Sequence, residues 1–338
     1  MAVSSPLAPA PVMSTMKAIV QTQYGSPAVL QLAEVERPTV LENGVLVRVH
    51  ATAVSAGTWH LMRGKPFLIR LIFGGLIRPK IQILGADIAG TVAAVGPAVT
   101  QFQVGDEVFG DLSESGFGAF AEYACAPETA LALKPANLPF AAAATVPVSA
   151  LAALQSLRDV GQLQPGQTVL INGASGGVGS FAVQIAKAFG AEVTAVCGPQ
   201  KVAMVSGLGA DHVIDYSQID VTQSGLQYDL ILDAAAYRPV ADFLPALAPQ
   251  GTYVVVGGAT PQFFQAMLLG AWMTRNSDRQ IKCLTSKPNQ ADLIVLKEMS
   301  EAGQIVPPVD RSYPLNEVPA AIRHLEQRQV QGKVAIVV

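Results

Sequence analysis

Ile171-Asn172-Gly173-Ala174-Ser175-Gly176-Gly177-Val178-Gly179-Ser180, read INGASGGVGS, places four glycines within seven residues directly after an apolar run. Glycine has no Cβ, so such a loop can turn tightly and let another group approach its backbone. Residues 168–172 predict a buried strand, and residues 180–189 predict a helix. A glycine loop between a strand and a helix is typical of a pyrophosphate site at the helix N-terminus, with a purely structural turn as the alternative.

The residues around this loop alternate between strand-like and helix-like patterns. Strands are expected at 168–172, 191–196, 212–216, 228–234, 251–258 and 280–284, and helices at 180–189, 201–209, 241–248 and 263–273. Alternating strands and helices indicate βαβ units and a parallel sheet. The predicted fold class of this section is therefore α/β, a doubly wound parallel sheet of the Rossmann type.

The preceding part of the chain is rich in short strand patterns. They lie at 16–21, 44–54, 90–95, 104–110 and 120–126 with Gly and Pro between them, and they indicate a small barrel-like domain that ends near Leu138. Residues 1–15 lack the positive charge and the long apolar core of a secretory signal. We expect a disordered tail, with an upstream start before a folded protein that begins near Met16 as the alternative. Helices are expected at 291–305 and 318–327, before a closing strand at 333–338 that could return to the first domain.

The residues after the second strand of the expected parallel sheet bear on the choice of dinucleotide. An NAD site usually has an Asp or Glu about 20 residues beyond the glycine loop, where it binds the adenosine ribose. Residues 196–201 read VCGPQK and contain no acid, while Glu192 lies at the wrong end of its strand. Lys201 and Ser175 could instead hold a 2'-phosphate, which favours NADPH. The alternative is that Lys201 is an ordinary exposed lysine at a helix start.

Length and composition exclude several function classes. A chain of 338 residues suits two domains with real cores. Its net charge is -3 and it has no cluster of Lys and Arg, so we expect no binding to nucleic acid. The cysteines, Cys125, Cys197 and Cys283, are widely spaced and odd in number, which favours a reducing, cytoplasmic location.

One long apolar segment, residues 66–84 (PFLIRLIFGGLIRPKIQIL), is interrupted by Arg70, Arg78, Lys80 and a glycine pair. These interruptions exclude a membrane-spanning helix, so no stable membrane insertion is expected. The segment is interpreted as a buried or half-buried loop and helix, with a lid over an apolar substrate or a contact with a membrane surface as alternatives.

The run VLINGASGGVGSFAVQIAKAFGAEVTAVCGPQK, followed by LGADHVIDY, resembles the medium-chain dehydrogenase/reductase superfamily, and most closely its quinone oxidoreductase branch related to zeta-crystallin. GADIAGTVAAVG, VGDEVFG, GAFAEYACAP and GKVAIVV follow in family order, so the similarity extends from about Met16 to Val338. The resemblance implies a GroES-like catalytic domain at 16–138 and 287–338, and a Rossmann NADP-binding domain at 139–286. It also implies a homodimer through the sheet edge near residues 281–284.

The same resemblance implies roles for individual residues. Lys201 and Tyr216 would hold the 2'-phosphate, Thr145 would lie near the nicotinamide, and Gly257 and Gly258 would approach the cofactor. The full set of expected cofactor-binding residues is Thr145, Gly173, Ala174, Ser175, Gly176, Gly177, Val178, Gly179, Cys197, Gly198, Lys201, Tyr216, Gly257 and Gly258.

Zinc-dependent relatives in this superfamily use a Cys in an early loop of the barrel and a His in a GHE motif. Here the loop reads AVSAGTWHLMRG and the motif position reads Gly85-Ala86-Asp87, and the four-cysteine structural lobe is also missing. No metal site is therefore expected. Asp87 is interpreted as a structural hydrogen-bonding residue. Without a Lewis acid, quinones and α,β-unsaturated carbonyls become the plausible hydride acceptors, because the charge of their product is delocalised.

Hydrogen-bond donors for such a substrate are expected from Ser55, Thr58 and His60 in this early loop, where other quinone reductases often have Asn and Pro. The alternative for Ser55 and Thr58 is a local role as turn-forming hydroxyls. Trp59, Phe67 and Phe73 either line an apolar wall for a flat substrate or belong to the core.

The sequence thus predicts a zinc-independent, NADPH-dependent oxidoreductase that transfers hydride to quinones. One alternative is an NADPH-dependent reductase of alkenal or enone double bonds. An alternative of another class is an NADPH-binding protein with little turnover. The expected partners are a small apolar quinone or enone and a second copy of the chain.

Overall fold

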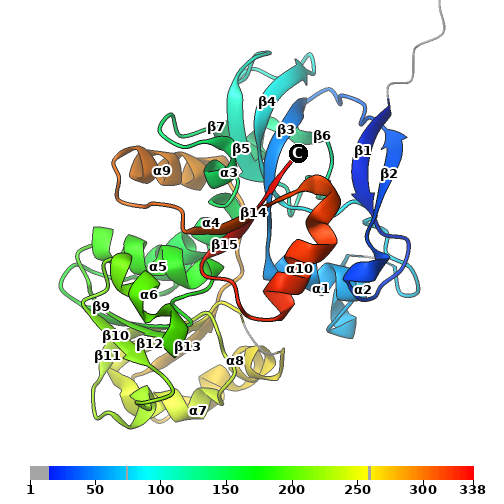
Figure 1. Ribbon diagram of the computed structural model, residues 1–338. Helices are drawn as coiled ribbons and strands as arrows, with labels where there is room; N and C mark the ends of the chain where they lie inside the picture. Colours follow the sequence, from blue (N-terminus) through cyan, green and yellow to red (C-terminus); the bar gives the residue numbers. More distant parts are fainter. Residues whose placement is uncertain (1–14, 74, 258–259) are drawn as a thin grey trace, which may run out of the picture.

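The computed structural model describes residues 15–73, 75–257 and 260–338, and these residues form two large sheets with helices around them (Figure 1). Residues 1–14, most of the expected disordered tail, lie outside the described residues. Thr15 was assigned to that tail, but it begins a strand, so this end of the prediction was one residue wrong.

The first large sheet has six strands in the order β10-β9-β8-β11-β12-β13, and every neighbouring pair is parallel. Its members are β8 (Thr168–Asn172), β9 (Glu192–Cys197), β10 (His212–Asp215), β11 (Tyr228–Asp233), β12 (Leu247–Val255) and β13 (Gln280–Cys283). The strand order reverses between β8 and β11. In open α/β sheets, ligands bind outside the carboxyl ends of the strands at such a reversal. The predicted Rossmann sheet is confirmed.

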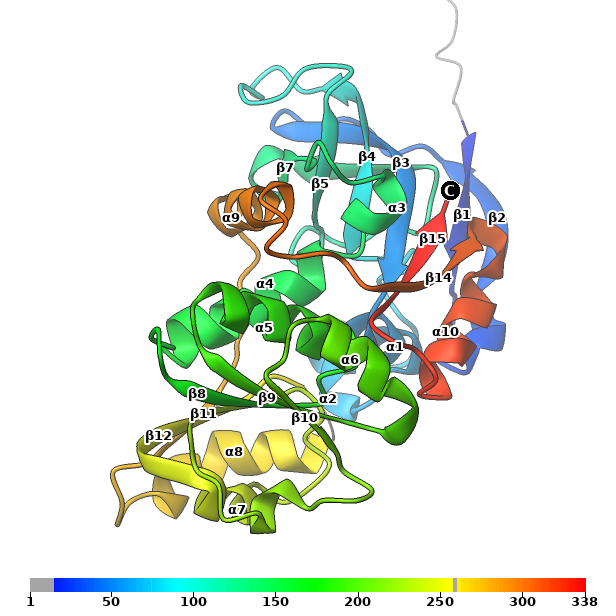
Figure 2. The ribbon, with the colours of Figure 1, turned by 60° about the vertical axis from the view of Figure 1, so that its left-hand side comes forward.

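Helices cover both faces of this sheet, as Figure 2 shows. One face carries α4 (Pro147–Gln155), α5 (Gly177–Ala188) and α6 (Val202–Gly207), and the other carries α7 (Val240–Phe243) and α8 (Thr260–Met273). The spacing of Phe181 and Ile185 places both side chains on one side of α5, where they are fully buried. The apolar faces of these helices therefore fix the sheet between two layers.

The second large sheet contains the C-terminal strand next to an N-terminal one. Its order is β14-β15-β3-β4-β5-β7, with β6 also paired to β3. The strands are β3 (Gly44–Val54), β4 (Asp87–Val95), β5 (Glu107–Asp111), β6 (Tyr123–Pro127), β7 (Leu131–Leu133), β14 (Val309–Pro314) and β15 (Lys333–Val337). β15 pairs antiparallel with β3, so the closing strand returns to the N-terminal sheet as expected.

A separate hairpin, four helices and the short helix α2 (Phe67–Ile72) lie around this sheet. The hairpin pairs β1 (Thr15–Val20) with β2 (Gln31–Glu36). The helices are α1 (Ala56–Arg63), α3 (Phe140–Ala143), α9 (Gln290–Glu301) and α10 (Val318–Glu326). Sequence patterns missed β2 and β14 because most of their side chains are exposed or half-exposed, so neither strand shows an apolar run. No helix among the described residues is both long and apolar enough to cross a bilayer.

Two expectations about the N-terminal segments were wrong. The residues around Ser55, Thr58 and His60 were expected to form a loop, but they belong to α1 or cap it. Ser55 begins the helix as its N-cap, and Gly64 ends it at φ 59°, a left-handed conformation that suits glycine. Within 66–84, the expected helix is present as α2 (Phe67–Ile72), but it is more exposed than the buried or half-buried interpretation, since only Ile69 and Arg70 are half-buried.

Candidate functional site

The glycine loop connects β8 to α5 at the carboxyl end of the parallel sheet. Gly173 has φ 80°, and Gly176 is the N-cap of α5. A Cβ on Gly179 would lie 2.2 Å from the backbone oxygen of Gly173, a contact that no side chain tolerates. The backbone amides of Gly173 and Ala174 donate to the Val196 carbonyl, which fixes the loop to the end of β9. Glycine is therefore required where the helix start packs on the loop.

The start of α5 favours an anion. The amides of Gly177, Val178 and Gly179 lie in the first helical turn, which has no intrahelical acceptors and carries a partial positive charge. That turn contains no acidic residue. A Cβ on Gly176 would meet Gly173 O at 3.5 Å and nothing nearer, so this side of the loop leaves room for a group to approach. The loop fits a phosphate of a dinucleotide.

A buried carboxylate organises the neighbouring strand ends. Asp233, at the end of β11, is fully buried and accepts from Asn172 Nδ2 at 2.8 Å and from Tyr253 Oη at 2.5 Å. Its Oδ1 also accepts from the backbone amides of Ala235 and Ala236, at 3.1 and 2.6 Å. Burial and the Asp233 charge both raise the pKa of Tyr253. One carboxylate thus connects the ends of β8, β11 and β12 beneath the glycine loop.

The residues expected to select the cofactor gather at the ends of β9 and β10. Gly198 faces the ring of Tyr216, and a Cβ on it would lie 3.2 Å from Tyr216 Oη. Tyr216 is 65% exposed, and its backbone amide donates to Cys197 O. Cys197 is buried, and burial raises the pKa of its thiol, so this side chain packs as a neutral group.

Lys201 is not the freely exposed lysine of the alternative interpretation. Its Nζ donates to Arg328 O at 3.0 Å and to Val330 O at 2.7 Å. Burial lowers the pKa of this amine. The two carbonyls belong to residues 326–333, which run from the last residue of α10 to the first residue of β15 and which we call the strap. Sequence patterns did not identify the strap as part of the site.

The strap also reaches the glycine loop. The backbone amide of Gly332 donates to Ser175 O at 2.8 Å. Lys333 is buried, and a Cβ built on Gly177 would lie 3.0 Å from Lys333 Cδ. The guanidinium of Arg328 lies over the ring of Tyr237, 4.5 Å from its centroid. The strap therefore spans the carboxyl ends of several strands of the parallel sheet.

Lys333 is anchored by the buried carboxylate of Asp87, which has a second buried acid opposite it. Its Nζ lies 3.2 Å from Asp87 Oδ2, and the other oxygen of Asp87 accepts from Val148 N at 2.8 Å. Asp111 is opposite Asp87 in the β4–β5 pairing. Burial raises the pKa of Asp87, and burial followed by the Asp87 charge raises the pKa of Asp111 to about 6. These contacts support the structural interpretation of Asp87.

The expected roles of Thr145 near the nicotinamide and of Gly257 near the cofactor stay predictions. Thr145 is fully buried, and its hydroxyl donates to Ala142 O at 2.7 Å. Gly257 follows β12 and is half-buried. Gly258, expected beside it, lies outside the described residues.

The expected donors on α1 are occupied by local hydrogen bonds. Ser55 Oγ accepts from Thr58 N at 3.3 Å and lies 3.1 Å from Thr58 Oγ1, and Thr58 is almost fully buried. Both hydroxyls therefore help to start the helix. His60 Nδ1 lies 2.7 Å from Lys65 O. Since a carbonyl only accepts, Nδ1 carries the proton, and Nε2 of the neutral ring is an acceptor.

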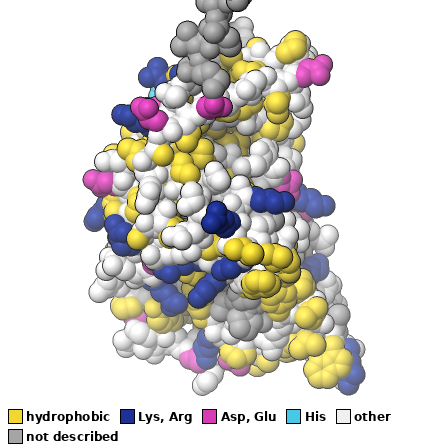
Figure 3. All heavy atoms as spheres, turned by 90° about the vertical axis from the view of Figure 1, so that its right-hand side faces the viewer, with side chains coloured by type: hydrophobic (Ala, Val, Ile, Leu, Met, Phe, Trp, Pro, Cys, Tyr) yellow, Lys and Arg dark blue, Asp and Glu magenta, His cyan; other side chains and the backbone are white. Residues whose placement is uncertain are grey.

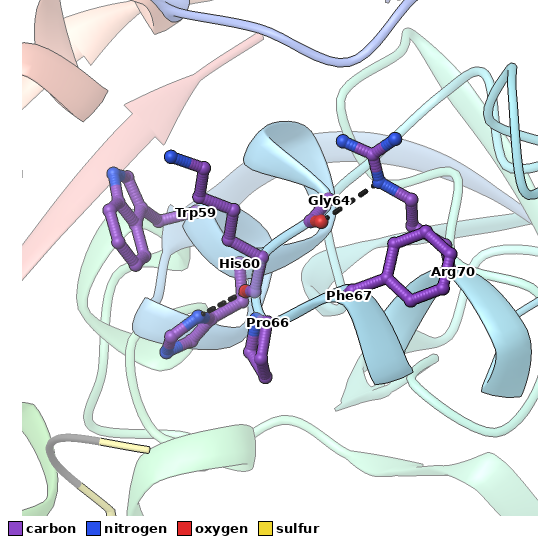
Figure 4. Close-up of a pocket in the computed structure, with 7 residues that line it drawn as sticks. Trp59, His60, Gly64, Pro66, Phe67 and Arg70 are labelled. Atoms are coloured by element: carbon purple, nitrogen blue, oxygen red, sulfur yellow. Dashed lines mark hydrogen bonds between the residues drawn. The ribbon is translucent and has the colours of Figure 1, made fainter. Parts of the chain in front are cut away.

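A cavity of about 540 Å³ lies beside α1 (Figure 4), and its lining residues come from α1, α2 and the turn between them: Trp59, His60, Gly64, Lys65, Pro66, Phe67 and Arg70. Trp59 and Phe67 thus reach a cavity wall, whereas Phe73 packs edge-on against Phe117 with ring centroids 5.8 Å apart. Two of the three residues predicted for the aromatic wall, Trp59 and Phe67, therefore line the cavity.

One strap residue also bonds to side chains of α1 beside this cavity. Glu326 Oε1 accepts from Trp59 Nε1 at 2.6 Å and from Arg63 Nε at 2.8 Å. Gly332, which binds the glycine loop, is six positions after Glu326, and six residues span at most about 20 Å. The cavity and the glycine loop are therefore two parts of one region.

The described part of the chain contains no group of three or more His, Cys, Asp and Glu side chains that could hold a metal ion. Polar partners of the other histidine side chains are Thr91 for His50, Glu192 for His212 and Asp310 for His324.

Sequence reasoning missed Asp233, Asp111 and Lys333 as parts of this region. The available signal was a charged residue within or next to an otherwise apolar strand pattern, since such a residue is buried only when it has partners.

Comparisons with known proteins agree with this arrangement. An alcohol dehydrogenase GroES-like domain matches residues 42–136, and a zinc-binding dehydrogenase domain matches residues 208–336. The chain is 31% identical to a chloroplast envelope quinone oxidoreductase homolog of Arabidopsis thaliana, over 95% of this chain and 98% of that protein. It is 32% identical to a chloroplastic NADPH-dependent alkenal/one oxidoreductase of the same species, over 97% of this chain and 81% of that protein. The solved quinone oxidoreductase of Coxiella burnetii has a TM-score of 0.85 at 27% identity, covering 96% of this chain and 100% of that one.

Proposed function

We propose a specific reaction for this chain, which belongs to the quinone oxidoreductase branch of the medium-chain dehydrogenase/reductase superfamily. The chain is an oxidoreductase with a GroES-like N-terminal domain and a Rossmann-type parallel sheet. The proposed reaction is the transfer of a hydride from NADPH to a small apolar quinone, without a metal ion. The observation that carries the proposal is the glycine loop at the sheet reversal, joined by the strap to a cavity with aromatic walls.

The cofactor is proposed from the residues at the strand ends. Gly173, Gly176 and Gly179 would take the pyrophosphate on the amides of α5, and NADPH supplies the hydride when it is bound. A 2'-phosphate would meet the ammonium of Lys201 and the hydroxyl of Tyr216, with the Arg328 guanidinium on the neighbouring strap. No acid at 196–201 would repel it. These contacts support NADPH over NADH.

The metal-free chemistry is proposed from the side chains at the positions of the zinc ligands. The zinc-binding dehydrogenase match covers residues 208–336, whereas the position of the GHE motif is Gly85-Ala86-Asp87, outside that match. The Asp87 carboxylate is committed to Lys333 and to the amide of Val148. Charge that develops on a substrate oxygen must then be met by hydrogen-bond donors of the protein.

The cavity offers a different donor set from the one that the sequence predicts. Ser55 and Thr58 already bond to each other at the start of α1, so their free donor capacity is small. His60 can donate through Nε2 only when it is protonated, because Nδ1–H is bound to Lys65 O. The ammonium of Lys65 lines the same cavity and is exposed. We propose the Lys65 ammonium as the group that binds the substrate oxygen, with His60, Trp59 and Phe67 lining the rest of the cavity.

Reduction of an activated carbon–carbon double bond is the second candidate. It is favoured by relatives at 32% identity that are named for such chemistry, the alkenal/one oxidoreductase and a 2-methylene-furan-3-one reductase of Solanum lycopersicum. Both reactions would use the same cofactor position and the same donors, because each places negative charge on a carbonyl oxygen.

The test is NADPH consumption by the chelator-treated protein with an ortho-quinone and, separately, with an alkenal, with identification of each product. Fast quinone turnover with an inert alkenal supports the main proposal. A saturated aldehyde as the main product would replace it with the second candidate. Activity that disappears with the chelator and returns with zinc would refute the metal-free chemistry.

A homodimer and a cytoplasmic location are also proposed. β13 ends the strand order of the parallel sheet, so its outer edge is available for pairing with a second copy in a homodimer. A cytoplasmic location stays a prediction from the cysteine content.

A further inference from the structure

Five large apolar side chains project from α2 and the residues after it. Ile77 is 86% exposed and Ile72 is 66% exposed. We call this group the apolar platform, and its members are Leu68, Leu71, Ile72, Leu76 and Ile77. Figure 1 places α2 on the right-hand side of the molecule, the side that faces the viewer in Figure 3, where hydrophobic side chains gather beside Lys and Arg. Contiguous exposed apolar groups of this size mark an interaction surface.

The platform is built into the fold. Arg70 Nε donates to Gly64 O at 3.0 Å and its Nη1 donates to Leu76 O at 3.3 Å, so one side chain connects both ends of the segment. Its guanidinium also lies 4.4 Å from the ring centroid of Tyr24, whose hydroxyl donates to Gly75 O at 2.8 Å. These bonds hold the backbone while the apolar side chains point outward.

The charge around the platform has a single sign in the sequence. No Asp or Glu occurs between Glu42 and Asp87, while six Lys and Arg residues do. Arg63 is paired with Glu326, and Arg70 binds backbone carbonyls. The exposed cations next to the platform are Lys65, Arg78 and Lys80. An apolar surface with cations beside it matches an acyl layer covered by anionic head groups.

We propose that the apolar platform docks the protein onto the surface of an anionic lipid bilayer. A second copy of the chain is a poorer occupant, because a symmetric contact would bring Arg78 and Lys80 of one copy against the same cations of the other. The docking rests on these side chains alone. If the proposed function also holds, Phe67, which begins α2 and lines the cavity, would connect the bilayer surface to the site of an apolar quinone.

The test is co-flotation of the full chain with vesicles of phosphatidylcholine alone or of phosphatidylcholine and phosphatidylserine in equal parts, without cofactor or substrate. We expect flotation with the anionic vesicles only. Binding should fall when NaCl rises from about 0.05 to about 0.5 M, since the Debye length shortens roughly threefold. The double variant Ile72→Ser/Ile77→Ser should weaken binding at least about tenfold. Arg78→Glu/Lys80→Glu should have an effect of at least that size.

Matched controls change the same residue types elsewhere. Ile219→Ser/Leu226→Ser alters two side chains that are 51% and 55% exposed, and Arg48→Glu/Arg311→Glu alters two exposed arginines. Both controls should float like the parent protein. The platform variants should keep the parent's turnover of a water-soluble quinone, which separates loss of docking from failure of the proposed reaction.

Three results would overturn the proposal: no flotation of the parent protein with either vesicle, undiminished flotation of the Ile72→Ser/Ile77→Ser variant, or a smaller sedimenting species for that variant without lipid. The last result would make the platform an interface between copies of the chain.

Discussion

The negative charge of Asp111 destabilises the folded protein. Removing this charge should increase the free energy of unfolding by an amount that depends on pH. The carboxyl lies opposite Asp87 in the β4–β5 pairing and is 3% exposed. Its Oδ1 accepts from Ser113 N at 2.8 Å, while the ammonium of Lys333 pairs with Asp87. Burial and, after it, the charge of Asp87 raise the pKa of Asp111 from its ordinary 3.8 to about 6.

The size of the effect follows from that rise. At about 1.4 kcal/mol per pKa unit, raising the pKa from 3.8 to about 6 costs the folded state about 3 kcal/mol once Asp111 is ionised. Between these two pKa values the folded protein holds a proton that the unfolded chain has released, so stability falls as pH rises. The cost is near zero below pH ~3, about 1 kcal/mol at pH ~4.5, and complete at about 3 kcal/mol above pH ~7.

The variant Asp111→Asn should keep the hydrogen bond from Ser113 N through its amide oxygen and remove the charge. We expect it to be more stable than the parent by about 3 kcal/mol at pH ~7.5 and by about 1 kcal/mol at pH ~4.5. Urea unfolding at both pH values measures the difference. Asp215→Asn is the matched control, because Asp215 Oδ1 accepts from Ser217 N at 2.9 Å in the same kind of turn but is only half-buried. A variant less stable than the parent at pH ~7.5, or a difference independent of pH, would refute the reasoning.

Three further changes test the site. Lys201→Glu should raise the KM for NADPH at least about tenfold and leave the KM for NADH within about twofold; equal losses for both cofactors would show a structural role instead. Gly179→Ala should destabilise the protein by about 1–3 kcal/mol and abolish tight NADPH binding in a fluorescence titration, because its Cβ would meet Gly173 O at 2.2 Å. The control Gly207→Ala, with no atom within 4 Å of the added Cβ, should be neutral. Glu326→Gln should raise the KM for quinone more than it changes the KM for NADPH, since Trp59 and Arg63 lose their shared carboxylate. Unchanged quinone kinetics would show that the cavity does not bind the quinone.

Much of the fold could be predicted because its buried elements have clear sequence patterns. β8 begins and ends at the expected residues, and so does the long strand β3, since both are apolar runs bounded by turn residues. The exposed strands β2 and β14 lack such runs and were missed. α1 was taken for a loop because its composition is mixed, although Ser55 and Gly64 are suitable caps.

The candidate site was predictable only where it is local in the chain. The glycine loop needs nothing beyond its own residues and the two elements that flank it. The partners of Lys201 lie 127 and 129 residues away, and Asp87 and Lys333 are 246 residues apart. No spacing rule connects such positions in a single sequence, so the sequence identified Lys201 and Asp87 as candidates but not the contacts that position them.

Those distant contacts determine how Lys201 can serve a cofactor. An ammonium group has three N–H donors, and two of them bind Arg328 O and Val330 O. Because each such bond is worth about 1 kcal/mol net, a 2'-phosphate that displaced both would lose much of what it gains from the lysine. The third donor is not used by either carbonyl, so a phosphate can bind without displacing them. In the proposed function, the strap would therefore orient the ammonium for a 2'-phosphate. Because Glu326 and Gly332 fix the strap at α1 and at the glycine loop, this orientation would depend on both parts of the site.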